Sequence, residues 1–417
     1  MPLRAISLLL PGLAFFFLAQ ACLAQAPPLA DGDYRIDLYG GPVLGSTRVV
    51  GLAGAYAALA EKTVGLPFNA ASAANRTTYS DTRFDWGLGY DFLFPGTFRK
   101  DHFDFDNNGR SLRRNTSLLE LAGLIQWGSF GLGLRVRGQS NQFQDDVSPP
   151  RIFEAGMGTF QFTGGYGLFD HQLVFGTGLR IGYFNVHESG EGENAFSATT
   201  VGTDFGLLLR PQAWPVRLGA SLLVPLTSEV SLDEEPGTLP SLFLPEKGIA
   251  IPVELRLGGA VLFGKRAWNA LPEAFRPAAP SRPEAEETEE EAKPEPYLDA
   301  FYVLLSAEIV IWGAVRDAVG IDGFLQQIEE RSGRVPTCSV RLGAETEVWP
   351  DQLRLRGGTY WEPSRFEDYP GRLHVTFGLE ARLFEVHFLG HYTLNFSAAV
   401  DFAQRYSNIS LSIGFWH

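Results

Sequence analysis

The sequence predicts an all-β fold: a transmembrane antiparallel β-barrel of about 14 strands with a helical plug near its N-terminal end. Three observations predict this fold. Long segments alternate apolar and polar residues, as strands with two different faces do. Short and long connections alternate between these segments, which is typical of membrane barrels. A segment of small residues with helical periodicity comes before the first of them.

The first 24 residues have the pattern of a signal peptide. Arg4 is followed by an apolar run, and small residues at Cys22, Ala24 and Ala26 offer cleavage after Ala24. The polar Gln20 argues against a retained membrane helix, and a lipoprotein site at Cys22 lacks the usual upstream leucine. We therefore expect three parts: residues 1–24 as signal peptide, 25–82 as the N-terminal plug segment and 83–417 as the barrel.

Composition limits the class of protein. Cleavage after Ala24 leaves Cys338 as the sole cysteine, so an intramolecular disulfide is excluded. The formal net charge is −14, or −15 once Arg4 is removed, and no basic patch is present. Nucleic acid is therefore not an expected partner. Glycine (46 residues) and aromatic side chains (13%) are abundant, which suits closely packed strands with aromatic residues at membrane interfaces.

The predicted plug follows residue 45. Val49, Leu52, Tyr56 and Leu59 recur at helical spacing, and the residues between them are mostly glycine and alanine. Such a thin helix fits where other backbone lies close against it. After Gly65 the periodicity ends, and residues 67–72 are predicted as an irregular turn. A short packing helix at the edge of a β domain is the alternative interpretation.

The strand pattern is clearest in the C-terminal half. Leu355 and Leu379 belong to apolar faces, whereas Arg356 and Glu380 belong to polar ones. A soluble sandwich with a polar outer face would show the same alternation. Many of these segments run to ten residues or more, however, and soluble strands are mostly about five or six residues long. We therefore expect apolar residues to face lipid and charged residues to face the lumen.

The predicted strands lie near 83–93, 117–127, 130–140, 154–167, 172–186, 196–210, 214–226, 250–264, 299–313, 338–349, 352–361, 372–384, 386–401 and 406–416. Short turns are expected at 127–129, 169–170, 212–213, 349–351 and 384–385, and longer loops on the opposite side. With both termini on the periplasmic side, all the short turns fall there.

Charged residues on the inward faces are expected to neutralise one another in a lumen charge network, because an unpaired buried charge is costly. The expected pairs are Glu254 with Arg256, Arg341 with Glu345, and Arg356 with Glu380. Arg382 is the remaining member of this network.

One connection is unusually long for the short-turn side. Residues 265–298 contain six prolines, and seven glutamates fall between Glu284 and Glu295, a composition typical of disordered segments. A solvated linker is the simpler interpretation. A binding site for a basic periplasmic partner is the alternative.

Motifs for chemistry are few. Asp104, Asp106 and Asn108, followed by Gly109, match the first half of a calcium loop, but Asn115 stands where a closing glutamate is needed. A polar loop tip is the simpler account of this stretch. No nucleophile elbow and no metal-spaced histidine pair occurs. We expect neither an enzyme nor a cofactor.

The stretch after residue 50 resembles the N-terminal signature of the FadL-type outer-membrane proteins, the long-chain fatty-acid transporters and their relatives. Their Gly-rich G-x-G-G-A-Y-x-A-x-A-x-D stretch is followed by an aromatic residue and Asn-Pro-Ala-Gly. Two departures occur: Ala70 stands for the proline and Ser72 for the glycine. The matching residues are Gly51, Gly54, Ala55, Tyr56, Ala58, Ala60, Phe68, Asn69 and Ala71.

The resemblance implies a barrel in the bacterial outer membrane, in contact with lipid, that passively takes up hydrophobic small molecules. It also implies that Gly51, Gly54, Tyr56, Phe68 and Asn69 form a plug or gate. The alternative, also found among the family's relatives, is an accessory or docking barrel that transports nothing. An apolar lumen cavity would favour transport, and a charged, blocked lumen would favour docking.

Overall fold

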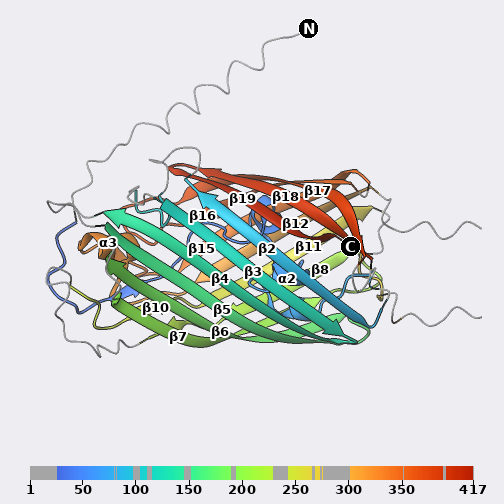
Figure 1. The fold of residues 1–417 in the computed structure, drawn as a ribbon, viewed down its shortest axis with the longest axis horizontal. Helices are drawn as coiled ribbons and strands as arrows, with labels where there is room; N and C mark the ends of the chain where they lie inside the picture. Colours follow the sequence, from blue (N-terminus) through green and yellow to red (C-terminus); the bar gives the residue numbers. More distant parts are fainter. Residues whose placement is uncertain are drawn as a thin grey trace, which may run out of the picture.

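The computed structural model shows one closed β-barrel whose lumen holds the N-terminal segment (Figure 1). The structure describes residues 26–78, 80, 82–96, 104–109, 115–144, 152–188, 194–228, 243–264, 268–272, 275, 301–350, 352–387 and 391–416. The expected signal peptide and the glutamate-rich part of the 265–298 connection lie outside these residues.

Fourteen strands form the barrel, as predicted, and each pairs antiparallel with its neighbour. β19 pairs with β2 to close the ring. In chain order the strands are β2 (Phe84–Pro95), β3 (Asn115–Trp127), β4 (Phe130–Gln144), β5 (Ile152–Leu168), β6 (Leu173–Glu188), β7 (Asn194–Leu209), β8 (Val216–Leu223), β11 (Glu254–Gly264), β12 (Tyr302–Trp312), β15 (Thr337–Trp349), β16 (Leu353–Glu362), β17 (Arg372–His387), β18 (His391–Ala403) and β19 (Tyr406–Trp416).

Alternation along these strands separates two faces. Leu355 and Leu379 are 41% and 42% exposed on the outside, whereas Arg356 and Glu380 are buried in the lumen. β12 alternates buried and exposed positions along its whole length. The outward face is a continuous apolar surface, and the inward face carries the charges. This is the arrangement that a strand between lipid and a polar lumen requires.

The two ends of the barrel differ. Short connections join β3 to β4, β5 to β6, β7 to β8 and β15 to β16 at one end, which we call the turn end. Exposed aromatic side chains gather there, among them Trp127, Trp214 and Trp349. The described residues of the 265–298 connection also lie at the turn end, as the parity of the strands predicts, because Asn269 donates hydrogen bonds to the Trp214 and Val216 carbonyls.

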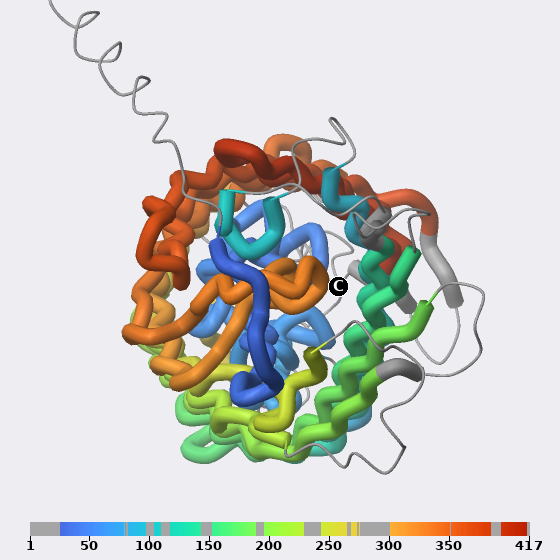
Figure 2. Tube along the Cα trace, turned by 90° about the vertical axis from the view of Figure 1, so that its left-hand side faces the viewer, coloured from blue at the N-terminus to red at the C-terminus, as the bar shows by residue number. Residues whose placement is uncertain are grey.

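The opposite, loop end is covered by a small sheet that the sequence does not predict. Its order is β14 (Arg331–Ser332), β13 (Ala318–Gly320), β1 (Arg35–Asp37), β10 (Ile249–Ile251) and β9 (Leu226–Thr227). β1 pairs in parallel with both β13 and β10. Figure 2 looks onto this end and shows the N-terminal segment (dark blue) crossing the mouth beside the yellow-green and orange loop segments.

The N-terminal segment then runs through the lumen from the loop end to the turn end, where β2 begins. The prediction that both ends of the mature chain lie on the turn side is therefore wrong for its N-terminal residues. Pro28 forms a β-bridge to Ile328, and Leu29 donates its N–H to the Gln327 carbonyl, so this part is held among the loops.

Three further local predictions are wrong. The helix expected through Leu59 ends early: α1 spans only Thr47–Gly51, because Ala53 and Gly54 adopt positive φ (54° and 75°). Two other short helical pieces follow, α2 (Lys62–Gly65) and the 3-10 helix η2 (Ala70–Ala73). No helix among the described residues is long and apolar enough to cross a membrane.

The other two corrections concern strand limits. The strands expected at 214–226 and 250–264 are each divided where Pro225 and Pro252 interrupt the pairing, since proline has no N–H to donate. The turn expected at 384–385 lies inside β17, where Phe384 pairs with Leu394. A β-bulge beside Arg382 places Leu383 and Phe384 both outward, which breaks the alternation.

Candidate functional site

The plug segment, residues 45–75, lies against the wall through backbone contacts. A Cβ added to Gly51 would lie 3.1 Å from the Arg356 Cβ and 3.2 Å from the Gly378 Cα. Gly54 adopts φ +75°, which a side chain would strain, and it also lies against Arg341 and Val43. The small residues are therefore needed because the plug fills a narrow space between strands.

Tyr56 and Phe68 meet at the centre of the lumen. Both are buried, their ring centroids are 6.2 Å apart and the rings meet edge-to-face. The Tyr56 hydroxyl accepts a hydrogen bond from Arg48 at 3.1 Å. The Arg256 guanidinium lies over the Phe68 ring, 4.9 Å from its centroid. The pair is thus held from both sides by cationic groups.

Asn69 holds the turn that follows. Its Oδ1 accepts the Ala71 N–H at 3.0 Å, which caps η2. Its Nδ2 donates to the Ala57 carbonyl at 2.8 Å and to the Leu207 carbonyl on β7 at 3.0 Å. Asn69 therefore joins two parts of the plug to each other and to the wall.

A ladder of alternating charges links the plug to four wall strands. Arg48 contacts Glu345 on β15 through two nitrogens (2.8 and 3.0 Å), the bidentate geometry of a strong ion pair. Arg48 also pairs with Glu61 at 2.7 Å, and Arg217 on β8 pairs with Glu61 at 2.6 Å. On the far side, Arg356 binds both Glu345 and Glu380. The ladder runs Glu380, Arg356, Glu345, Arg48, Glu61, Arg217.

A second wall carboxylate binds the plug backbone. Glu308 on β12 accepts the N–H groups of Tyr56 and Ala57 at 2.8 and 2.7 Å. Its other oxygen accepts from Arg256 at 3.0 Å, and Arg256 also contacts Glu254. Each buried charge in this group has an opposite charge or N–H donors, which compensates for its loss of water.

The predicted lumen charges fall into two groups. Glu254 lies with Arg256, and Arg356 with Glu380, as the pairing hypothesis states. The prediction that Arg341 pairs with Glu345 is wrong. Both residues lie on β15, four positions apart, which at ~3.4 Å per residue separates them by about 14 Å. Arg382 donates to the Thr393 hydroxyl at 2.8 Å near the turn end.

Two cavities formed by described residues adjoin the aromatic pair in the lumen. The outer cavity, of about 170 Å³, lies toward the loop end and is lined by Phe68. The inner cavity, of about 100 Å³, lies toward the turn end and is lined by Tyr56. The two rings that line the two cavities thus meet each other edge-to-face.

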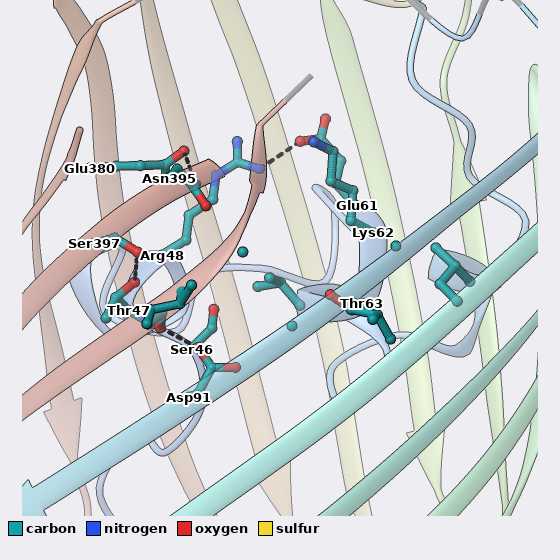
Figure 3. Close-up of a pocket in the computed structure, with 18 of the residues that line it drawn as sticks. Ser46, Thr47, Arg48, Glu61, Lys62, Thr63, Asp91, Glu380, Asn395 and Ser397 are labelled. Carbon is teal, nitrogen blue, oxygen red and sulfur yellow. Dashed lines mark hydrogen bonds and ion pairs between the residues drawn. The ribbon is translucent and has the colours of Figure 1, made fainter. Parts of the chain in front are cut away.

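The two cavities are lined by polar and apolar groups in similar proportion, but by different residues. The inner cavity is surrounded by hydroxyl, amide and charged groups of plug and wall, among them Ser46, Lys62, Asp91, Asn395 and Ser397 (Figure 3). The apolar part of the outer lining consists of Leu38, Pro42, Val43, Leu44, Pro67, Phe68, Phe105, Met157, Leu223, Ile251 and Trp312.

Five arginines also line the outer cavity. Arg135 pairs with Glu120 (2.7 Å), Arg180 lies 3.4 Å from Asp204, and Arg256 has the partners given above. Arg137 and Arg341 have no ion pair among the described residues. Arg341 is 2% exposed; its Nε donates to the Ser339 hydroxyl at 3.4 Å, and its guanidinium lies over the Trp312 and Tyr360 rings. An unpaired buried arginine is a candidate anion-binding group.

The side chains of the candidate calcium loop form hydrogen bonds within the protein. Asp104 is buried, and its two carboxylate oxygens accept the N–H groups of Asn108 (3.0 Å) and Gly109 (2.9 Å). Asn108 donates to Glu330 at 3.1 Å, which joins this loop to the neighbouring one, and Asp106 is also buried. Within the part of the chain that the structure describes, no group of three or more acidic, histidine or cysteine residues is arranged to hold a metal.

Several residues of the site are missing from the sequence-based list. Arg48 and Glu61 lie in the predicted plug, but helical periodicity draws attention to its apolar residues. Glu308 is the one charge inside an apolar strand, and this signal identifies it as an inward group. Trp268 and Arg217 carry no sequence signal of this kind, because their contact joins segments that only the fold brings together.

Comparison with solved structures shows the same architecture. A Pseudomonas aeruginosa FadL homologue is 12% identical with a TM-score of 0.54, and the alignment covers 90% of this chain and 99% of that one. The chain has the FadL-type fold. The P. putida toluene transporter TodX is 12% identical with a TM-score of 0.51, and the alignment covers 90% of this chain and 98% of that one. The monoaromatic hydrocarbon channel CymD is 12% identical with a TM-score of 0.50, and the alignment covers 90% of this chain and 97% of that one.

At 12% identity this likeness shows the fold alone. No protein-family profile and no curated protein sequence matches the chain. These solved barrels of similar fold are a FadL homologue, a toluene transporter and a hydrocarbon channel, and none of them is named as an enzyme.

Proposed function

We propose that the protein lies in a bacterial outer membrane, in contact with lipid, and passively takes up hydrophobic small molecules through its plugged lumen. The observation that carries this proposal is the outer cavity, in which eleven apolar residues, Phe68 among them, form half of the lining. A barrel that served only as a scaffold has no need of a cavity with so large an apolar part next to its mouth.

The unpaired arginines refine the substrate class. Arg341 and Arg137 line the same cavity without carboxylate partners, so the preferred molecule carries an acidic group on an apolar body. The apolar part would contact residues such as Val43, Phe68 and Trp312, and the acidic group would pair with Arg341. The toluene transporter TodX and the monoaromatic hydrocarbon channel CymD, which share this fold, support an apolar substrate body.

The plug supplies the barrier. Phe68 lines the outer cavity and Tyr56 the inner one, and their rings meet edge-to-face, so in this proposal passage requires the two rings to move apart. Gly51 and Gly54 let the plug backbone approach the wall, and Asn69 holds the turn behind Phe68. These five residues are our proposed gate.

Binding of three probes to the purified protein tests the proposal: a medium-chain alkyl carboxylate, the alcohol of equal chain length and acetate. We expect the carboxylate to bind best, the alcohol about tenfold more weakly and acetate not measurably. Arg341→Gln should remove the difference between the first two. Arg382→Gln, which lines neither lumen cavity, should leave it unchanged. If neither the alkyl carboxylate nor the alcohol binds or enters proteoliposomes, the proposed uptake function is wrong.

An accessory or docking barrel is the second candidate. It is favoured by the inner half of the lumen, where six charges link plug and wall in one ladder. Under this alternative, none of the three probes crosses the membrane. The acidic 276–298 stretch lies outside the described residues, and a basic periplasmic partner for it stays a proposal.

Orientation can be tested separately. We propose that the turn end faces the periplasm, where outer-membrane barrels place their short turns. A protease site inserted after Pro283 should then resist protease added to intact cells and be cut after the outer membrane is permeabilised. Cleavage in intact cells would mean that the turn end faces the outside of the cell.

A further inference from the structure

The beginning of the long 265–298 connection folds back beneath the plug instead of leaving the barrel. Trp268 and Asn269 are packed against the turn end of the lumen, and Asn269 is only 4% exposed. Asn269 donates to the Trp214 and Val216 carbonyls, each at 2.8 Å, which attaches the connection to the turn before β8. We call residues 268–272 together with Phe275 the turn-end latch.

Arg217 is the junction between wall, latch and plug. Its Nε donates to the Asn269 Oδ1 at 2.7 Å and its Nη2 to the Trp268 carbonyl at 2.9 Å. Its Nη1 donates to Glu61 at 2.6 Å and to the Leu59 carbonyl at 3.3 Å, both in the plug. Two of the three guanidinium nitrogens thus bind the latch, and the third binds the plug.

The Trp268 ring completes this arrangement. It lies against the Arg217 guanidinium, 3.8 Å from ring centroid to Cζ, and its indole N–H donates to Glu61 at 3.1 Å. Glu61 therefore accepts from Arg217 and Trp268 on one oxygen and from Arg48 on the other. The cation–π contact and the fixed orientation of Arg217 both depend on the latch.

A second contact lies at the end of the plug. Arg210 donates to Asn75 and to the Arg76 carbonyl, each at 2.6 Å, and to the Ala270 carbonyl of the latch at 3.3 Å. The Arg76 guanidinium lies 5.4 Å from the centroid of the Phe275 ring, which also contacts His171. Both ends of the inner plug half, at Glu61 and at Arg76, are thus covered by the same short segment.

We propose that the turn-end latch holds the plug in its closed position and that Trp268 positions the Arg217–Glu61 ion pair for this purpose. Without the Trp268 side chain, Arg217 keeps its charge and its hydrogen bonds to Asn269 and to the carbonyl of residue 268, but it loses the ring packed against its guanidinium, and Glu61 loses the hydrogen bond from the indole N–H. The plug is then held from the opposite side, by Arg48 with Glu345, and opens more often. This inference adds a restraint to the gate in the proposed function, but it does not depend on what is transported.

Plug opening can be measured directly with a cysteine in the inner cavity. In a Cys338→Ser background, Val64→Cys places a thiol on the plug beside the inner cavity. We expect Trp268→Ala to raise the rate at which a charged maleimide labels this thiol by about tenfold in the purified barrel. Trp127→Ala is the matched control, since Trp127 is 75% exposed at the same end and touches no part of the latch; it should leave the rate unchanged.

Folding is checked by the heat-dependent electrophoretic mobility of each variant. If Trp268→Ala does not assemble, Trp268→Phe replaces it, because phenylalanine keeps a ring over Arg217 and loses only the hydrogen bond to Glu61. A labelling rate equal to that of the parent in both variants overturns the latch, whatever the transport result. A raised rate in a barrel that transports none of the probes supports the latch and contradicts uptake.

Discussion

The inner and outer halves of the lumen contain the same kinds of side chain, but they differ in whether their arginines form ion pairs. In the inner half, Arg356, Glu345 and Arg48 each have charged partners, and the plug is packed against the wall through them. In the outer half, Arg341 and Arg137 line a partly apolar cavity and have no ion pairs among the described residues. Paired charges compensate for their own burial, whereas unpaired ones are costly until something binds them.

The comparison suggests a division of roles. We propose that the inner half restrains the plug, because the six charges of its ladder are paired within the protein. We propose that the outer half binds substrate, because two of its five arginines, Arg137 and Arg341, have no ion pair among the described residues. Function is thus expected where the electrostatic arrangement is incomplete, which agrees with the general observation that stability is given up at functional sites.

Removing the plug is the strongest way to break this comparison. Deletion of residues 45–75 should leave a barrel that assembles, since β2 begins at Phe84, and that barrel should conduct small solutes in liposome-swelling assays. Water would enter and solvate the charges that the plug had paired. If the deleted barrel does not assemble, the segment is a structural core. If it assembles and stays sealed, the docking alternative is the better one.

Two arginine substitutions sharpen the comparison. Arg356→Leu should destabilise the folded barrel by about 3–5 kcal/mol, because Glu380 and Glu345 each lose a buried partner. Arg341→Leu should leave the free energy of unfolding unchanged or raise it, since it removes an unpaired buried charge, while weakening carboxylate binding. Urea titrations in lipid vesicles measure both. If Arg356→Leu and Arg341→Leu lowered the free energy of unfolding equally, the inner and outer halves of the lumen would not differ in the pairing of their arginines.

The lipid face provides an intermediate effect. Leu379→Arg, near the middle of β17 and outward-facing, should cost about 2–4 kcal/mol of unfolding free energy in the same assay. Leu379→Met serves as the control and should cost less than ~1.5 kcal/mol, because it stays apolar and of similar volume. A tolerated arginine would mean that this face does not contact lipid.

The smallest expected effect is at the turn behind Phe68. Asn69→Ala removes a helix cap and two hydrogen bonds from Nδ2, so we expect a loss of about 1–3 kcal/mol and altered uptake of the alkyl carboxylate without altered assembly. Asn69→Asp keeps the capping oxygen but not the two donated bonds, and should restore only part of the loss. Unchanged uptake in both variants would exclude Asn69 from the gate.

Much of the barrel was predictable from the sequence. Local alternation predicts the 14 strands, their approximate limits and their two faces. Counting the strands predicts that the 265–298 connection lies at the turn end, because successive connections alternate between the two ends of the barrel. The errors in the strands occur where Pro225 and Pro252 end the pairing and where the bulge beside Arg382 shifts the pattern. Each of these is a local backbone event that a two-residue period does not record.

The candidate site was less predictable. Tyr56, Phe68 and Asn69 were identified through the resemblance, but the helix expected around Tyr56 was wrong beyond Gly51. Periodicity suggests a regular element, whereas the contacts of Glu308 with the Tyr56 and Ala57 N–H groups replace helical hydrogen bonds there. A backbone whose polar groups are satisfied by the surrounding wall need not be helical.

By itself, the sequence determined the architecture, because alternation of apolar and polar residues acts along each strand and needs no knowledge of its neighbours. Only the tertiary structure decided which charges are paired, since Arg48, Glu61 and Arg217 come from three separate segments. It also decided that β1 crosses the mouth and that Trp268 lies beneath the plug. These contacts join residues far apart in the chain, and their energies depend on distances that exist only once the barrel has closed.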